Sequence, residues 1–282
     1  MMNQDRNRPQ IRRADMLKMI VSGAAGRMGS RIIALGADMD EIELTGALEH
    51  PGQKHLGKDI GEVIGFGTTG VILTDDLGSI TGNADVLIDF SSPGATIACL
   101  KALSEKPFPV VIGTTGFSKE EIEHIKLYAQ KTPCVFAPNM SVGVNLLLKV
   151  LDDVARVTGD DYDVEIVEAH HRLKKDAPSG TAMKMAQVLA AALGRNLESD
   201  AVYSRHGLIG ERTQKEIGIQ TVRAGDIVGE HTVLFGGLGE RIEITHKASS
   251  RDTFARGALK AAQWVYKQTP GLYDMQDVLG LK

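Results

Sequence analysis

The sequence predicts an α/β fold: an N-terminal Rossmann-like, doubly wound parallel sheet, followed by a second α+β domain built on a mixed or antiparallel sheet. Three observations lead to this prediction. Strand-like apolar runs alternate with helix-like runs from residue 18 to residue 140, as in parallel sheets. A glycine-rich turn follows the first of these strands. Later strand-like runs, at 216–222, 230–235 and 241–246, follow one another without helices, which is typical of antiparallel or mixed sheets.

Length and composition indicate two folded domains. With 282 residues, 43% of them hydrophobic, the chain can bury two cores. We expect a disordered extension at 1–16, a dinucleotide-binding domain at 17–141 completed by 251–282, and a substrate-binding and oligomerisation domain at 142–250.

The same composition limits the possible partners and location. No apolar run is long enough for a membrane span, and the first residues lack the apolar middle of a signal peptide. We therefore expect a cytoplasmic protein without a membrane partner. The net charge of -4 argues against nucleic acid as a partner, although the arginines between Arg6 and Arg13 leave a short basic arm open. Cys99 and Cys134 do not form a zinc or redox pattern, and we expect both to be reduced and buried.

The first strand and the turn after it predict a dinucleotide site. Gly23, Gly26 and Gly29 have the spacing G-x-x-G-x-x-G, a variant of the dinucleotide fingerprint, in which a tight turn brings backbone N–H groups to a pyrophosphate. Glycine-rich turns also simply join strands to helices, so this motif alone leaves both interpretations open. The expected cofactor-binding residues of the turn are Gly23, Ala24, Ala25, Gly26, Arg27 and Met28.

The second predicted strand, 42–48, ends in Glu49. An acidic residue there can accept hydrogen bonds from the ribose hydroxyls of the cofactor, although a solvated glutamate at a strand end is the simpler alternative. Neither His50 nor Ser92 supplies the arginine that a 2′-phosphate would need. The sequence therefore predicts that NADH is preferred to NADPH. Residues 51–73 are glycine-rich without periodicity, and we expect a long loop.

The remaining strands of the first domain end in polar or small residues that can line the nicotinamide half of a cofactor. We expect strands at 85–90, 110–112 and 134–137, and helices at 93–103 and 119–130. Ligands of doubly wound sheets gather at the carboxyl ends of the strands, but each of these segments can also be an ordinary turn. The candidate cofactor-binding residues at these ends are Gly113, Thr114, Thr115, Ala137, Pro138, Asn139 and Met140.

The second domain is organised around EAHHRLKKDAPSGTA, residues 168–182. A strand at 162–167 should lead to His170 and His171, and a helix at 181–193 should follow Ser179, a common helix-capping residue. Free N–H groups at residues 179–181 would attract anions, as helix starts do. With two lysines in the same loop, the segment predicts a carboxylate or phosphate pocket that contains a proton donor. Helices are also predicted at 143–157 and 253–267. A histidine pair can bind metal, but no cysteine or carboxylate stands at ligand spacing, so we expect no metal.

These motifs together resemble the 4-hydroxy-tetrahydrodipicolinate reductase (dihydrodipicolinate reductase) family. The resemblance rests on E-x-H-H-x-x-K-x-D-A-P-S-G-T, on GTTG at 113–116, on Glu49, and on VRAGDIVGEHTV and ERIEITHKASSR nearer the C-terminus. It implies NAD(P)H-dependent reduction of a small cyclic dicarboxylate imine to tetrahydrodipicolinate, in the diaminopimelate route to lysine. It also implies a homotetramer, although the strand pattern is equally compatible with a dimer.

The resemblance also implies roles for the residues of the central motif. The proton donor or acceptor of the family falls on His170, and its catalytic lysine falls on Lys174. The implied substrate-binding residues are His171, Ser179, Gly180 and Thr181. A lysine can pair with a substrate carboxylate and donate a proton, whereas His170 can either donate the proton or orient and polarise the site. No role is expected for the isolated histidines His55, His124, His206, His231 and His246.

Two other functions remain as alternatives. One is a different dinucleotide-dependent reductase on the same scaffold; a semialdehyde dehydrogenase, however, needs a cysteine nucleophile in the second domain, and neither cysteine lies there. The other is a non-catalytic dinucleotide sensor. The presence of both His170 and Lys174 argues against a sensor, and a turnover assay separates the two.

Overall fold

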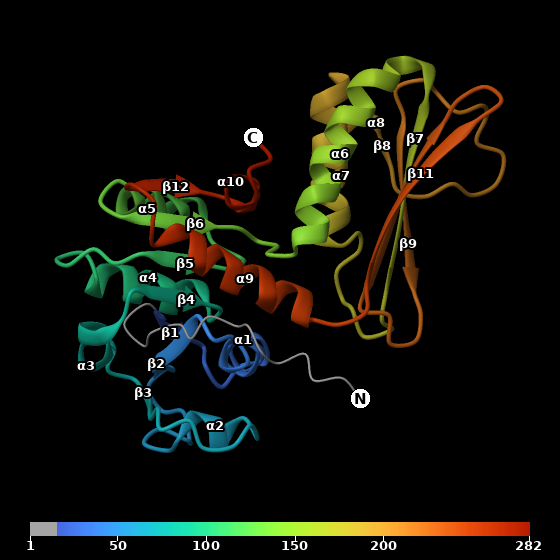
Figure 1. Cartoon of the computed structure of the whole chain (residues 1–282). Helices are drawn as coiled ribbons and strands as arrows, with labels where there is room; N and C mark the ends of the chain where they lie inside the picture. The colour runs from blue at the N-terminus through green and yellow to red at the C-terminus, as the bar shows by residue number, and fades with distance from the viewer. Residues whose placement is uncertain (1–15) are drawn as a thin grey trace, which may run out of the picture. The chain divides into compact units, whose positions relative to one another are not determined.

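The computed structural model describes residues 16–282 and contains two compact units (Figure 1). Unit 1 consists of the chain up to Met140 together with Phe254–Gly280, and unit 2 consists of Ser141–Thr253. The disordered extension expected at 1–16 falls, except for Met16, outside the described residues.

Within residues 16–282, unit 1 is built on a seven-stranded sheet in which every neighbouring pair is parallel. The strand order is β12-β6-β5-β4-β1-β2-β3, so the direction of winding reverses between β1 and β4, and the predicted doubly wound sheet is confirmed. The strands are β1 (Leu17–Ser22), β2 (Ile42–Leu48), β3 (Leu73–Thr74), β4 (Val86–Asp89), β5 (Val110–Ile112), β6 (Pro133–Phe136) and β12 (Gly271–Tyr273).

Helices cover both faces of this sheet and form two hydrophobic cores. One core joins the sheet to α1, α9 and α10, and the other joins it to α4 and α5. Such burial on both faces explains why these strands read as continuous apolar runs. The helices of unit 1 are α1 (Arg27–Ala37), α2 (Ile60–Val63), α3 (Leu77–Ile80), the 3-10 turn η2 (Thr81–Asn83), α4 (Pro93–Ala102), α5 (Lys119–Ala129), α9 (Asp252–Val265) and α10 (Met275–Leu279).

The expected long loop at 51–73 contains a helix that the sequence pattern did not predict. The side chain of Asp59 accepts hydrogen bonds from the N–H groups of Gly61, Glu62, Thr69 and Gly70, which caps α2 and ties its start to the loop that follows it. These bonds hold the pKa of Asp59 below its ordinary value. A four-residue helix is too short to show a periodic pattern, so only the capping aspartate could have indicated it.

Unit 2 is a five-stranded mixed sheet with two long helices, as far as the described residues extend. Its order is β11-β10-β7-β9-β8; β10 is antiparallel to both neighbours, whereas β7, β9 and β8 are parallel. Helices α6 and α7 lie along one face of the sheet (Figure 1). The elements are α6 (Val142–Thr158), the 3-10 turn η3 (Gly159–Asp161), β7 (Asp163–His170), α7 (Gly180–Leu193), α8 (Leu197–Asp200), β8 (Ala201–Val202), β9 (Ile217–Arg223), β10 (Gly229–Gly236) and β11 (Arg241–Ala248).

Strand β7 places the central motif. Its residues alternate between the two faces of the sheet, and Val164, Ile166, Glu168 and His170 are the buried ones. The predicted strand was too short, because β7 continues to His170. Since residues two apart on a strand share a face, Glu168 and His170 both point to the side that α7 covers.

Candidate functional site

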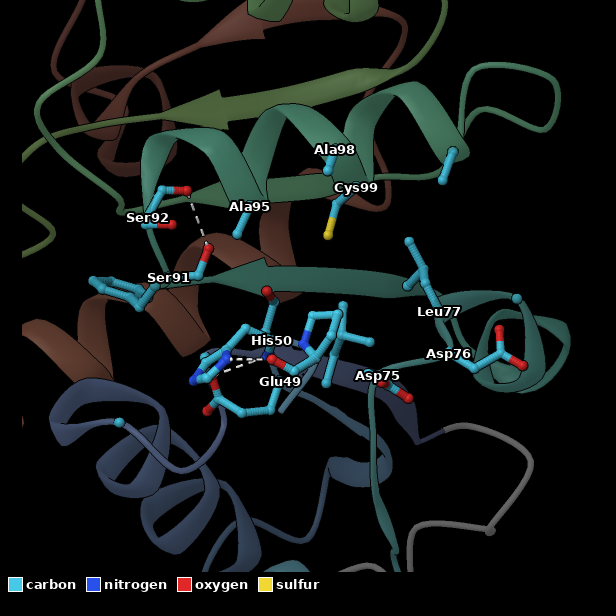
Figure 2. Close-up of a pocket in the computed structure, with 18 residues that line it drawn as sticks. Glu49, His50, Asp75, Asp76, Leu77, Ser91, Ser92, Ala95, Ala98 and Cys99 are labelled. Carbon is cyan, nitrogen blue, oxygen red and sulfur yellow. Dashed lines mark hydrogen bonds between the residues drawn. The ribbon is translucent and has the colours of Figure 1, made fainter. Parts of the chain in front are cut away.

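Unit 1 contains a cavity of about 630 Å³ at the carboxyl ends of β1, β2 and β4, next to the point where the winding of the sheet reverses. Figure 2 shows Ala95, Ala98 and Cys99 along α4, with Glu49 and His50 across the cavity. A cavity of this size is in the range of small-molecule sites. The lining residues are Ser22, Gly23, Gly26, Leu48, Glu49, His50, Pro51, Asp75, Asp76, Leu77, Gly78, Phe90, Ser91, Ser92, Ala95, Ala98, Cys99 and Ala102.

The glycine turn beside the cavity leaves no room for side chains. Gly23 has φ +71°, and a Cβ on it would lie 2.4 Å from the carbonyl oxygen of Phe90. A Cβ on Gly29 would lie 2.2 Å from the carbonyl oxygen of Gly23. Both positions therefore require glycine, because the turn packs directly against the backbone of Phe90 and against its own carbonyl groups.

Acidic side chains dominate the charge of the cavity wall. Glu49, Asp75 and Asp76 line it, and the lining set contains neither lysine nor arginine. The Glu49 carboxylate accepts a hydrogen bond from the N–H of Ala25 at 3.1 Å, so it is fixed to the glycine turn. Its position beside that turn is suited to ribose hydroxyls.

A buried carboxyl group lies at the end of β4, next to the cavity. Asp89 is fully buried, and its Oδ1 accepts hydrogen bonds from the Ser91 N–H and hydroxyl and from the Thr114 hydroxyl. Its Oδ2 is buried without a hydrogen-bond partner. Burial raises the pKa of Asp89, and the hydrogen bonds from Ser91, Thr96 and Thr114 only partly oppose this.

The predicted cofactor residues divide into two groups. Only Gly23, Gly26 and Glu49 line the cavity; the others stand on the glycine turn or after β5 and β6. Among these, Ala24, Ala137 and Met140 are buried in the core, and Thr114 is 5% exposed with its hydroxyl bonded to Ser91 and Asp89. The structure thus brings Thr114 close to the cavity wall through Ser91. The residues outside the lining are Ala24, Ala25, Arg27, Met28, Gly113, Thr114, Thr115, Ala137, Pro138, Asn139 and Met140.

Both cysteines are free and buried, as predicted. Burial raises the pKa of Cys99 to about 11 and that of Cys134 to about 12. Since the thiolate is the reactive form, neither cysteine is activated as a nucleophile.

Unit 2 contains a buried polar cluster around the end of β7. His170 is 8% exposed, and its Nδ1 lies 2.6 Å from Oε2 of Glu168, which is fully buried. Arg223, at the end of β9, forms a two-pronged ion pair with Glu168, with both nitrogen–oxygen distances at 2.9 Å. Burial alone would raise the pKa of Glu168, but the bonds from Arg223, His170 and the Ser179 N–H hold it below its ordinary value.

Lys174 lies in the loop after β7 and is partly buried. Its Nζ is 2.8 Å from both carboxylate oxygens of Asp176. The loop is held by the backbone, because the N–H of His171 donates to the carbonyl of Ile227 at 2.7 Å and the N–H of Lys174 donates to that of His171. Burial lowers the pKa of His170, and Lys174 and Arg223 lower it further, while Glu168 opposes them.

The helix start is only partly as predicted. Ser179 caps α7 by accepting the N–H of Ala182 at 3.1 Å. The expectation that the Ser179 N–H is free was wrong, since it donates to Oε1 of Glu168 at 3.0 Å. The two residues are eleven positions apart in the chain, so the pairing depends on the return of the chain from β7 to α7.

His231 belongs to the cluster, although no role was expected for it. It stands on β10 opposite Glu168, is 4% exposed, and its Nε2 is 3.0 Å from the Ser179 hydroxyl. Its ring meets that of His170 edge-on, with centroids 5.1 Å apart. Burial lowers its pKa to about 4. Arg223 was not predicted either. Both residues lie in the VRAGDIVGEHTV segment, where the only available signal was the family resemblance.

The described residues provide neither a metal site nor a membrane span. Among residues 16–282, no group of three or more His, Cys, Asp or Glu side chains is arranged to bind a metal ion. In the same part of the chain, no helix combines the length and apolarity that crossing a membrane requires.

A parallel sheet of this order, with a glycine turn and a cavity at its switch point, is the architecture of the doubly wound, dinucleotide-binding class of folds. Two family models match the chain: dihydrodipicolinate reductase, N-terminus, over residues 17–140, and dihydrodipicolinate reductase, C-terminus, over residues 143–279. The chain belongs to the dihydrodipicolinate reductase family, and it is an oxidoreductase.

Individual relatives support this assignment. The 4-hydroxy-tetrahydrodipicolinate reductase of Syntrophus aciditrophicus (strain SB) is 58% identical over 267 residues, which cover 95% of this chain and 100% of the relative. That of Syntrophobacter fumaroxidans is 56% identical over the same coverage. The dipicolinate-bound dihydrodipicolinate reductase from Paenisporosarcina sp. TG-14 has a TM-score of 0.73 and 27% identity, over 93% of this chain and 98% of that chain.

Proposed function

We propose that this protein reduces 4-hydroxy-tetrahydrodipicolinate to tetrahydrodipicolinate with NADH or NADPH, in the diaminopimelate route to lysine. The observation that carries the proposal is the cluster at the end of β7, where His170 and Lys174 stand beside the start of α7 in a chain of this family. The substrate is a dicarboxylate whose ring takes up a hydride and a proton. A lysine ammonium group can pair with one carboxylate and supply the proton, and a helix start can bind the other carboxylate.

The residues of unit 1 suit a nicotinamide dinucleotide, which supplies the hydride when it is bound. The turn from Gly23 to Met28 would hold the pyrophosphate at the start of α1, where Arg27 and Met28 would offer their backbone N–H groups. The N–H groups of residues 23–26 donate to acceptors within unit 1 and brace the turn. Glu49 would accept hydrogen bonds from the ribose hydroxyls of the cofactor. We assign the segments after β5 and β6, residues 113–115 and 137–140, to the nicotinamide half.

The acidic wall of the cavity supports NADH as the preferred cofactor. A 2′-phosphate near Glu49 would also meet Asp75 and Asp76, without an arginine or lysine among the lining residues to pair with it. Unpaired like charges at short range are unfavourable. His50 is the one histidine of that lining, and its Nδ1 donates a hydrogen bond to the carbonyl of Pro51 at 2.9 Å, so this nitrogen is not available to a phosphate.

We assign the proton donor of the reaction to Lys174. Burial holds the pKa of His170 below its ordinary value of 6.5, so at neutral pH this histidine is mostly uncharged and a weaker source of protons than an ammonium group. Lys174 would exchange its pairing with Asp176 for a substrate carboxylate. His171 and the start of α7 at Gly180 and Thr181 would bind the second carboxylate.

The proposal includes a cytoplasmic homotetramer. The face of the unit 2 sheet opposite α6 and α7 carries Val167 and Leu234, which are only partly buried, and Val222, which is exposed. These apolar side chains stand among polar ones such as Glu165, Glu230 and Thr232, and a mixed face of this kind can pack against another copy. The two free thiols are compatible with a reducing compartment. Light scattering after size-exclusion chromatography gives the number of subunits directly, and a monomer would refute the assembly.

The test of the function is NADH oxidation followed by absorbance, with the substrate generated in situ from pyruvate and aspartate semialdehyde and NADPH run in parallel. We expect turnover that depends on both precursors, faster with NADH. Cofactor binding without turnover would refute the proposed reaction and would favour a different reductase or a sensor.

A further inference from the structure

Both carboxylate oxygens of Glu168 accept hydrogen bonds from several groups. The carboxylate accepts hydrogen bonds from both terminal nitrogens of Arg223, from the Ser179 N–H at 3.0 Å and from the Thr221 hydroxyl at 3.2 Å. These partners come from β9 and from the start of α7, so two elements packed against β7 fix the carboxylate. The remaining contact of the carboxylate joins its Oε2 to Nδ1 of His170.

This arrangement determines which ring nitrogen of His170 carries the proton. An ionised carboxylate is an acceptor only, and Glu168 is ionised because its donors hold its pKa below the ordinary range. At 2.6 Å, Nδ1 of His170 must therefore be the donor. In the neutral ring, Nε2 then has a free lone pair.

Two neighbours, Gly229 and His231, leave Nε2 of His170 accessible and free of a second imidazolium. A Cβ on Gly229 would lie only 3.1 Å from Nε2 of His170, so the glycine leaves space at this atom. The neighbouring ring of His231 is bonded to the Ser179 hydroxyl and is neutral at physiological pH, with a pKa of about 4. The ring of His231 therefore carries no positive charge that would repel a proton on His170.

We propose that Glu168, clamped by Arg223, is a positioning residue that fixes the ring of His170 as the Nδ1–H tautomer and directs Nε2 toward the reacting substrate or Lys174. The inference rests on the proposed function. It assigns a task to a buried ion pair that would otherwise serve only stability, and buried ion pairs contribute little net stability on average.

The test compares Glu168→Gln with Glu165→Gln. The substitution at Glu168 keeps the size of the side chain but removes the charge that requires a donor at Nδ1. Glu165 is the matched control, because it lies on the same strand but on the other face, where it pairs with Arg205 at 2.9 and 2.7 Å. The readouts are kcat, KM, NADH affinity and the pH profile of kcat.

We expect Glu168→Gln to lower kcat by about 10- to 100-fold, the scale for losing a group that orients a functional histidine, with NADH affinity unchanged. The charged groups around His170 are Glu168, Arg223, Lys174 and the titratable His231. Since Glu168 raises the pKa of His170, its loss should move the acidic limb of the profile to lower pH. Glu165→Gln should alter neither quantity.

An unchanged kcat in Glu168→Gln, or an equal loss in Glu165→Gln, would overturn the inference. A second measurement on the unmodified protein covers a variant that fails to fold. Long-range ¹H–¹⁵N spectra of histidine-labelled protein, assigned with His170→Gln, should show His170 as the Nδ1–H tautomer; the Nε2–H form would overturn the inference. Absent turnover in the unmodified protein would refute the proposed function instead.

Discussion

The cavity of unit 1 and the histidine cluster of unit 2 are built in opposite ways. Six of the 18 residues that line the cavity are glycine or alanine, and the Glu49 carboxylate accepts a hydrogen bond from a main-chain N–H. The cluster consists of side chains that saturate one another, from Arg223 through Glu168 to His170. The first region should therefore be sensitive to added volume, and the second to changes of charge and protonation.

The largest effect is expected in the cluster, from Lys174→Ala. Removing the ammonium group should lower kcat by on the order of 10²-fold or more, the usual scale for a general acid, while NADH affinity is kept. Stopped-flow or steady-state NADH oxidation measures kcat. The adjacent Lys175→Ala is the control, because Lys175 is exposed; comparable losses in both variants would show a general charge effect and remove Lys174 from the mechanism.

A single added methyl group should distort the glycine turn beside the cavity. In Gly29→Ala the new Cβ would lie 2.2 Å from the carbonyl oxygen of Gly23, so the turn must shift. We expect NADH affinity to fall by roughly 100-fold, about 3 kcal/mol, as measured by fluorescence titration. Gly82→Ala is the control, since a Cβ there meets nothing within 4 Å. Normal affinity in Gly29→Ala would mean that the turn adapts.

The cluster should also make stability depend on pH. His231 has a pKa of about 4 in the folded protein against an ordinary value of 6.5, so between these values the unfolded chain binds a proton that the folded protein does not. Stability is then full above pH 6.5 and is lost as the pH falls toward 4, by about 1.4 kcal/mol per pH unit. From pH 6.5 to about pH 5 this is about 2 kcal/mol.

Urea denaturation at a series of pH values measures this dependence. His231→Gln should flatten it, because glutamine does not titrate. The exposed His206→Gln should keep the slope of the unmodified protein. An unchanged slope in His231→Gln would show that His231 is protonated in the folded state or that other groups cause the loss.

The smallest expected effect concerns cofactor choice. Glu49→Ala should weaken NADH binding by about tenfold, the scale of one hydrogen bond to a charged group, and should weaken NADPH binding less. Titration with each cofactor gives the ratio. Glu41→Ala is the control, because Glu41 is exposed and does not line the cavity. Equal weakening of the two cofactors would show that Glu49 does not distinguish the ribose.

The sequence predicted those parts of the molecule whose signals are local. Strand β2 and strand β5 have the predicted bounds, and α4 and α5 differ by one residue at the end. Ser179 was recognised as a cap from the residues next to it. Short elements such as β3, β8 and α10 were missed, because a few residues cannot show a period.

The cluster could be predicted only in part, because its partners are distant in sequence. Glu168 and His170 are two residues apart, whereas Arg223 and His231 reach them through the pairing of β9 and β10 with β7. That register is a property of the folded sheet, and a single sequence does not specify it. The only signal for Arg223 and His231 in the sequence was the family resemblance of VRAGDIVGEHTV.

The return of the chain to unit 1 has a consequence for synthesis. Ala255, Ala258 and Leu259 of α9 belong to the same core as β1, and a Cβ on Gly257 would lie 1.7 Å from the carbonyl oxygen of Met140. Until the ribosome has made this helix, one face of the N-terminal sheet is covered by α1 but lacks α9, whereas the sheet of unit 2 has already been translated. The segment that is made first is therefore the last to complete its core, and during translation its apolar sheet face stays partly exposed until α9 has been made.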